Sequence, residues 1–124
     1  MEIIKNILAV GAGSFIGGAA RYLVSLAMKG IGKGYPWATL AVNLVGCLMI
    51  GLLWGLLSRN AAENTSWGLF LTVGLCGGFT TFSTFSKEAL AMLQTGQMWG
   101  FAAYVILSVL AGVALVALGY YLFR

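Results

Sequence analysis

Charged side chains are scarce in this sequence. Only 8% of its 124 residues are Asp, Glu, Lys or Arg, whereas a soluble domain typically has about 25%. Hydrophobic residues make up 60% of the chain, and almost no length remains outside the apolar runs for a soluble domain. The composition therefore excludes an ordinary soluble protein and predicts an integral membrane protein.

Histidine is absent, and the only acids are Glu2, Glu63 and Glu88. Without histidine or paired carboxylates, no nucleophile has a base in reach, so we do not expect an enzyme. The cysteines, Cys47 and Cys76, lie within apolar segments and are interpreted as small buried hydrophobes. We predict neither a disulfide nor a thiol-bound metal from them, and no nucleic-acid partner.

Long apolar runs account for most of the chain. A helix needs roughly 20 residues to cross about 30 Å of hydrocarbon. Four segments reach that length, at about 3–28, 36–57, 67–93 and 98–122. The first is too long for the apolar core of a secretory signal. We predict an all-α, multi-pass protein with a single four-helix membrane domain over residues 1–124, located in the cell (inner) membrane.

The stretch Gly74–Ser86 differs from the surrounding apolar sequence because it combines glycines, hydroxyls and phenylalanines. Gly77 and Gly78 lower helix propensity, and the hydroxyls that follow can bond freed backbone groups. We therefore predict a break in the third helix. Interrupted backbone survives in a bilayer only where it is buried in protein or lines a polar cavity, so the break indicates a site for ions or substrates.

Polar residues inside the other segments need partners. Arg21 lies about eight residues before the first helix ends, where a charge in lipid costs at least ~2.5 kcal/mol. It faces either a vestibule or protein partner, or it snorkels to the interface. Asn43 is either interhelical glue or part of a pore lining. Tyr104 and Ser108 share a face of the fourth helix at spacing i, i+4.

Glycines at spacing i, i+4 recur in the first two helices, as Gly13/Gly17 and Gly51/Gly55. This spacing lets membrane helices approach closely. We interpret both pairs as packing positions.

The cationic side chains are balanced between the two sides of the membrane. Four helices place three of them on each side: Lys5, Arg59 and Arg124 against Lys29, Lys33 and Lys87. Membrane orientation is set by a Lys and Arg bias, which is missing here. The sequence therefore predicts insertion in both orientations and an antiparallel homodimer with two equivalent sites.

Phe79, Phe82 and Phe85 share one helix face at intervals of three. Phenylalanines in such a stripe usually pack in a core. The hydroxyl residues between them also allow an anion path, lined by hydroxyl donors and the positive edges of the rings. Carbonyls released by the glycine break are able to hold a small cation.

Three stretches carry a family resemblance. The motif Gly-Gly-Phe-Thr-Thr-Phe-Ser-Thr-Phe-Ser at Gly77–Ser86 resembles the signature of the Fluc (CrcB) fluoride channels. Thr39–Gly46 and the pattern from Gly13 to Tyr22 are similar to the same family. Ser14 and Ala38 depart from it, since glycine is more usual at both positions.

The resemblance implies a passive fluoride-selective channel that exports fluoride from the cytoplasm and lowers its toxicity. It implies a dual-topology homodimer with two antiparallel pores. Phe82 and Phe85 would turn their ring edges toward the ion. Other residues that the resemblance places on the fluoride pathway are Asn43, Ser83, Tyr104 and Ser108. Beyond Ser108 the next turn offers only Gly112, so water or another helix must serve there.

Two further sites are implied by the resemblance. Arg21 would sit near the vestibule and attract anions. Gly77 and Thr80 would contribute backbone carbonyls to a structural sodium ion at the centre of the dimer.

The main alternative is a proton-coupled exporter of organic cations, similar to the small multidrug resistance transporters. Those proteins are also antiparallel pairs of four-helix chains. Their coupling requires a carboxylate within the membrane. Glu2, Glu63 and Glu88 lie at a terminus, in a loop and near a helix end, so none is placed for that role.

Overall fold

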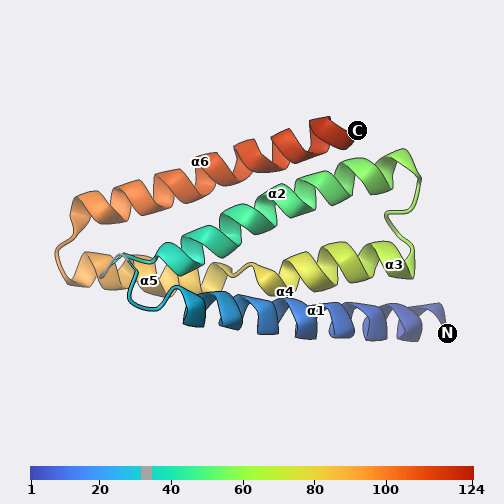
Figure 1. Cartoon of the computed structure of the whole chain (residues 1–124), viewed down its shortest axis with the longest axis horizontal. Helices are drawn as coiled ribbons and strands as arrows, with labels where there is room; N and C mark the ends of the chain where they lie inside the picture. Colours follow the sequence, from blue (N-terminus) through green and yellow to red (C-terminus); the bar gives the residue numbers. More distant parts are fainter. Residues whose placement is uncertain (32–34) are drawn as a thin grey trace.

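The computed structural model describes residues 1–31 and 35–124, and every regular element in them is helical. Within the described residues, four helical spans are long and apolar enough to cross a membrane: α1 (Glu2–Ala27), α2 (Trp37–Arg59), a composite span (Ser66–Gln94) and α6 (Met98–Phe123). They run along a common long axis, with both termini at one end (Figure 1). The predicted four-helix membrane protein is confirmed at this level.

The third span consists of several pieces. It begins with α3 (Ser66–Leu69), continues as a π-helix, η1 (Phe70–Cys76), and ends its first half with α4 (Gly77–Phe79). After two residues, α5 (Phe82–Gln94) resumes. At the start of the span, the Thr65 hydroxyl accepts a hydrogen bond from the Gly68 N–H. This is an ordinary N-cap.

Backbone dihedrals locate the interruption between α4 and α5. Thr80 has φ −88° and ψ 162°, and Thr81 has φ −150° and ψ 120°, so both residues are extended. Gly77, in contrast, is helical, with φ −62° and ψ −38°. The extended residues thus follow the two glycines that mark the weak point in the sequence. Gly78 instead allows close packing, since an added Cβ would lie 2.7 Å from the Ser14 carbonyl oxygen.

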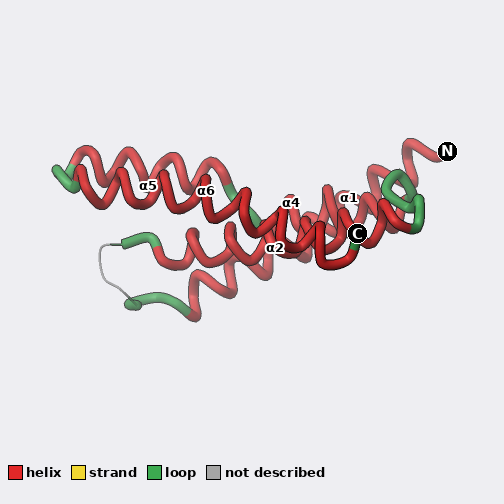
Figure 2. The backbone as a smooth tube through the Cα atoms, turned by 90° about the horizontal axis from the view of Figure 1, so that it is seen from above, coloured by secondary structure: helices red, strands yellow, loops and turns green. Residues whose placement is uncertain are grey.

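The two halves of the third span pack against different helices. Its first half (α3, η1 and α4) lies along α1, whereas α5 packs against α6 and α2. Figure 2 shows the result at the end opposite the termini, where the α5–α6 turn lies apart from the last turn of α1 and the first turn of α2. The extended Thr80–Thr81 segment is therefore where the chain changes packing partners.

Glycines allow the closest contacts between spans. A Cβ added at Gly13 would lie 2.8 Å from the Leu75 amide nitrogen. A Cβ added at Gly119 of α6 would lie 2.6 Å from the Leu52 amide nitrogen of α2. The α1–η1 and α2–α6 backbones thus approach to distances that only glycine permits. The predicted packing role of Gly13/Gly17 and Gly51/Gly55 is confirmed, because each of these four glycines faces the backbone of a neighbouring helix.

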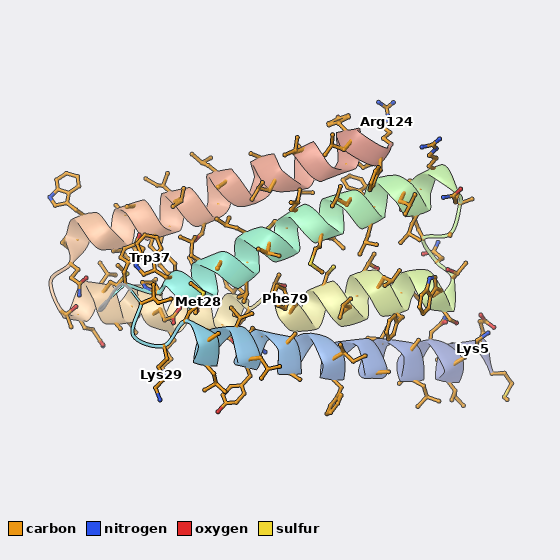
Figure 3. The ribbon with its side chains drawn as sticks, viewed as in Figure 1. Lys5, Met28, Lys29, Trp37, Phe79 and Arg124 are labelled. Atoms are coloured by element: carbon orange, nitrogen blue, oxygen red, sulfur yellow. The ribbon has the colours of Figure 1, made fainter. Side chains whose placement is uncertain are left out.

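Cationic residues lie at both ends of the molecule. Lys5 and Arg124 are at the end that holds the termini, and Lys29 is at the opposite end (Figure 3). Arg59 ends α2, and Lys87 is exposed on α5. Lys33, the remaining cation of the predicted balance, lies outside the described residues.

Candidate functional site

A cavity of about 380 Å³ lies among α2, the third span and α6, beside the extended segment. Figure 3 labels Phe79, the last residue before that segment, near the middle of the bundle's long axis. The cavity is mostly apolar, with a small number of polar groups, as small-ion and ligand sites often are. It brings together six of the predicted site residues: Asn43, Gly77, Thr80, Phe82, Phe85 and Ser108.

Three predicted site residues do not line this cavity. Tyr104 is fully buried behind it, with its ring centroid 5.0 Å from that of Phe85. Ser83 is exposed on the surface of α5. Arg21 is half-buried on α1, on the other side of the third span. The structure thus separates the predicted residues into a group around the cavity and these three, of which Tyr104 contacts the group.

Asn43 is clasped to the extended segment. Its Nδ2 donates to the Thr81 carbonyl at 3.0 Å, and its Oδ1 accepts from the Thr81 N–H at 2.7 Å. These two bonds replace helical partners that Thr81 lacks in its extended conformation. Asn43 is therefore interhelical glue. Because its amide has two N–H bonds and only one is used here, the other is free to donate into the cavity.

Phe82 and Phe85 form a pair of rings at the start of α5. Their centroids are 5.8 Å apart, and the ring planes are inclined by 42°. Phe85 is half-buried against Tyr104. Phe82 is 78% exposed in the single chain although it lies near the middle of a membrane span. Phe85 therefore has a packing role, while the edges and faces of Phe82 are open.

Ser108 carries an unpaired hydroxyl. Among the described residues, its Oγ is the one buried side-chain nitrogen or oxygen that has no hydrogen-bond partner. An unpaired buried hydroxyl costs roughly 1–3 kcal/mol in proteins. Since Ser108 also lines the cavity, a polar species there would satisfy it.

Arg21 binds the third span. Its Nε donates to the Gly78 carbonyl oxygen at 3.2 Å. Gly78 belongs to the last turn before the extended segment, where carbonyls lack helical donors and a cation is favourable. Of the alternatives for Arg21, the structure thus shows a protein partner.

The backbone around Gly77 and Thr80 leaves one carbonyl group without its usual helical donor. In a continuous helix, the Thr81 N–H would donate to the Gly77 carbonyl. Here it donates to Asn43 instead. Thr80 donates through both its N–H and its hydroxyl to the Cys76 carbonyl, at 3.1 and 3.0 Å. The arrangement leaves the Gly77 carbonyl without its helical donor, and carbonyl oxygens are the ligands that hard cations prefer.

Glu88 is a hydrogen-bond partner of a predicted site residue, and this contact was not predicted from the sequence. Its Oε1 accepts a hydrogen bond from the Tyr104 hydroxyl at 3.0 Å. Glu88 also borders a second cavity of about 320 Å³ at the end of the bundle, beside Tyr35 and Thr95. A signal was available, because Glu88 follows Phe85 at the same interval of three that links the phenylalanines.

Comparison with known proteins places this sequence in a family. The family model described as "CrcB-like protein, Camphor Resistance (CrcB)" matches residues 8–120. The chain belongs to the CrcB family. The resemblance of its third-helix motif to this family is thus confirmed, and the matched region of the CrcB chain contains every predicted site residue.

Curated relatives cover nearly the whole CrcB chain. One from Desulfotalea psychrophila is 41% identical over 122 residues, which is 98% of this chain and 94% of the relative. One from Phocaeicola vulgatus is 44% identical over 117 residues, which is 94% and 96%. One from Chlorobaculum tepidum is 44% identical over 112 residues, which is 90% and 89%. All three are named "Fluoride-specific ion channel FluC".

Proposed function

We propose that this chain is a passive, fluoride-selective ion channel of the membrane and not an enzyme. The observation that carries this proposal is the cavity where Asn43, Phe82, Phe85 and Ser108 meet. It is supported by full-length relatives named as fluoride-specific channels. Substrate identity comes from those relatives, whereas the cavity supplies a physical route by which the chain binds a small anion.

The donors around the cavity suit an anion in transit. A small anion loses a large hydration energy when it leaves water, so replacement donors must be close. Asn43 offers an unused amide N–H, Ser108 an unpaired hydroxyl, and Phe82 the positive edge of its ring. All three are neutral. Neutral groups bind without holding the ion permanently, which conduction requires.

The remaining predicted pathway residues fit around this route. The Tyr104 hydroxyl donates to Glu88, and the Tyr104 ring packs against the Phe85 ring. Ser83 is exposed one residue after Phe82 and would meet the ion at the mouth of the path. Arg21, anchored to the third span, would add positive potential to the vestibule.

Passive conduction leads to export in a cell whose interior is electrically negative. A potential of 100 mV is worth about 2.3 kcal/mol for each elementary charge and drives an anion outward. The proposed channel therefore lowers cytoplasmic fluoride and its toxicity without an energy source. This role places it in the cell (inner) membrane.

We propose a dual-topology homodimer with two antiparallel pores. Phe82 exposes 78% of its surface in the single chain, next to the cavity. An inverted copy would cover it and complete the walls of both cavities. The equal number of Lys and Arg residues that the sequence assigns to the two sides supports insertion in both directions. Lys5 and Arg124 lie at one end of the molecule and Lys29 at the other (Figure 3).

We propose that a structural sodium ion binds at the interruption of the third span, beside the extended Thr80–Thr81 segment. The described residues contain no cluster of three His, Cys, Asp or Glu side chains, so a cation there needs carbonyl oxygens. The Gly77 carbonyl fits, because Thr81 donates to Asn43 and not to it. Gly77 and Thr80 would hold the ion, which would neutralise the carbonyl dipoles that meet there. Its absence from a crystal structure grown in sodium would count against this assignment.

A proton-coupled cation exporter is not favoured. The described carboxylates do not line the central cavity, and the half-buried Glu88 is hydrogen-bonded to Tyr104 beside the second cavity. No curated relative described above is named as an exporter of organic cations.

The function is tested in liposomes that are loaded with potassium fluoride and contain the purified protein. Valinomycin is added to release potassium, and an electrode follows fluoride efflux. We expect fast fluoride loss from these vesicles and retention of chloride in vesicles loaded with potassium chloride. Equal leakage of the two anions would refute selectivity.

Phe82→Ile tests the cavity's part in this flux, because isoleucine keeps bulk but removes the ring edge. Phe15→Ile is a matched control, since Phe15 on α1 is also 78% exposed but does not line the cavity. We expect slower efflux only from the Phe82 variant. If both variants conduct like the unmodified protein, Phe82 has no role beyond packing.

Dual topology is tested with Asn64→Cys, which adds a thiol in the exposed loop between α2 and α3 and changes no charge, in a background in which both native cysteines are replaced by serine. An impermeant maleimide added outside sealed cells should label about half of the protein. Labelling of all or none would show a single orientation and remove the basis for an antiparallel dimer.

A further inference from the structure

The fourth span has a gap in its line of polar groups. Tyr104, Ser108 and Gly112 follow one another at spacing i, i+4 and share one face of α6. Tyr104 and Ser108 carry hydroxyls, whereas Gly112 has no side chain. An ion that passes Ser108 therefore meets no donor side chain from α6 one turn further along.

A thiol from α2 fills the space that Gly112 leaves open. A Cβ added at Gly112 would lie 3.2 Å from the Cys47 Sγ, and no atom of any other residue outside the local α6 backbone would come within 4 Å of it. Cys47 lines the same cavity as Ser108 and is only half-buried. It also follows Asn43 by one helical turn, so that the two side chains share a face of α2.

Cys47 thus lines the cavity together with Asn43 and Ser108, which both have an unused donor. The Asn43 amide has one unused N–H, and the Ser108 hydroxyl is unpaired. A neutral thiol is a weak S–H donor and is polarisable. It therefore continues the set of neutral donors by one helical turn beyond Asn43 and Ser108.

We propose that Cys47 is a further ion-contacting residue, whose S–H group takes the place of the side chain missing at Gly112. The inference rests on the proposed fluoride conduction. In this proposal, Cys47 of α2 donates to the ion at the level of Gly112, where α6 has no donor side chain.

The test compares fluoride efflux from liposomes for Cys47→Ala, Cys47→Ser and the double variant Cys47→Ala with Gly112→Ser. Loss of one hydrogen bond in the path corresponds to a rate reduction of about tenfold, which we expect for Cys47→Ala. Cys47→Ser should conduct at least as fast as the unmodified protein, because a hydroxyl is the stronger donor. The double variant should recover the lost rate, since removal of Sγ makes room for a serine at 112.

Val45→Ala is the matched control, because Val45 is 48% exposed on α2 and does not line the cavity. Its efflux rate should be unchanged. If Cys47→Ala conducts as fast as Val45→Ala, the inference is overturned while the channel function stands. If the unmodified protein passes no fluoride, the proposed function fails and this inference fails with it.

A second measurement does not depend on transport or on the alanine variant. In Cys76→Ser protein, Cys47 is the remaining thiol, and its reaction with a small methanethiosulfonate reagent is followed by mass spectrometry. We expect Cys47 to react and sodium fluoride to slow the reaction more than sodium chloride does. A thiol that reacts equally fast in both salts, or not at all, would place Cys47 away from the ion path.

Discussion

The Asn43 clasp leads to a prediction about the two roles of this amide. Asn43→Leu keeps the size of the side chain but removes both hydrogen bonds to Thr81, which measure 3.0 and 2.7 Å. A hydrogen bond between membrane helices contributes about 0.6 kcal/mol on average and at most about 1.7 kcal/mol. The backbone N–H and carbonyl of the half-buried Thr81 would then lack these partners in the folded protein. We therefore expect Asn43→Leu to lower the free energy of unfolding by roughly 1–3 kcal/mol.

Asn43→Asp separates structural from ionic effects. The carboxylate keeps an acceptor for the Thr81 N–H but has no donor for the Thr81 carbonyl, and it brings a negative charge into the cavity. Its loss of stability should be smaller than that of Asn43→Leu, whereas its fluoride efflux should fall further. Unfolding in detergent is followed by tryptophan fluorescence, and efflux by the electrode. An Asn43→Leu protein as stable as the unmodified one would refute the clasp.

Three further perturbations have defined outcomes. Gly119→Ala should destabilise the α2–α6 pair by about 1–3 kcal/mol through overpacking. Gly11→Ala is the control and should leave the thermal midpoint unchanged, because nothing outside the local helix backbone lies within 4 Å of the added Cβ. Equal midpoints for the two variants would contradict the close packing at Gly119. Tyr104→Phe removes the donor to Glu88 and should cost about 1 kcal/mol in unfolding experiments, and an unaltered stability would show that this bond contributes nothing. Arg21→Met removes both the charge and the hydrogen bond to the third span. Fluoride efflux should therefore become slower and less sensitive to ionic strength. An unchanged salt dependence of the efflux would exclude electrostatic attraction by Arg21.

The four spans follow from the sequence because a bilayer imposes one simple requirement on it. Each span needs about 20 apolar residues, and the predicted segments end within one or two residues of the observed helices. Glycine spacing was equally informative. Gly13 and Gly51 face the backbones of neighbouring helices. At such positions the absence of a side chain lets two spans approach closely.

The position of the interruption was harder to predict because it depends on a distant partner. Helix propensity points to Gly77 and Gly78, yet both are helical. The extended residues are Thr80 and Thr81, and Thr81 is held by an amide 38 positions earlier in the chain. Propensity is a local quantity and does not contain that contact. Glu88 was missed for a similar reason, since its hydrogen bond with Tyr104 joins two different spans.

The motif did indicate where the site would form. Phe82 and Phe85 line the cavity, and Asn43 and Ser108 reach it from α2 and α6. Ser83 and Tyr104 lie off its lining. Contact between these two residues and the ion depends on the proposed dimer and its occupied path, which a single chain's sequence pattern does not contain.

Selective fluoride conduction is tested most directly by the reversal potential of the purified protein in a planar bilayer. Potassium fluoride fills one chamber and an equal concentration of potassium chloride fills the other. A fluoride-selective path predicts a reversal potential far from zero, with the sign set by fluoride leaving its own side. A reversal potential at zero, with current present, would mean that the two anions pass equally well or that potassium carries the current, and either result would contradict the proposed function.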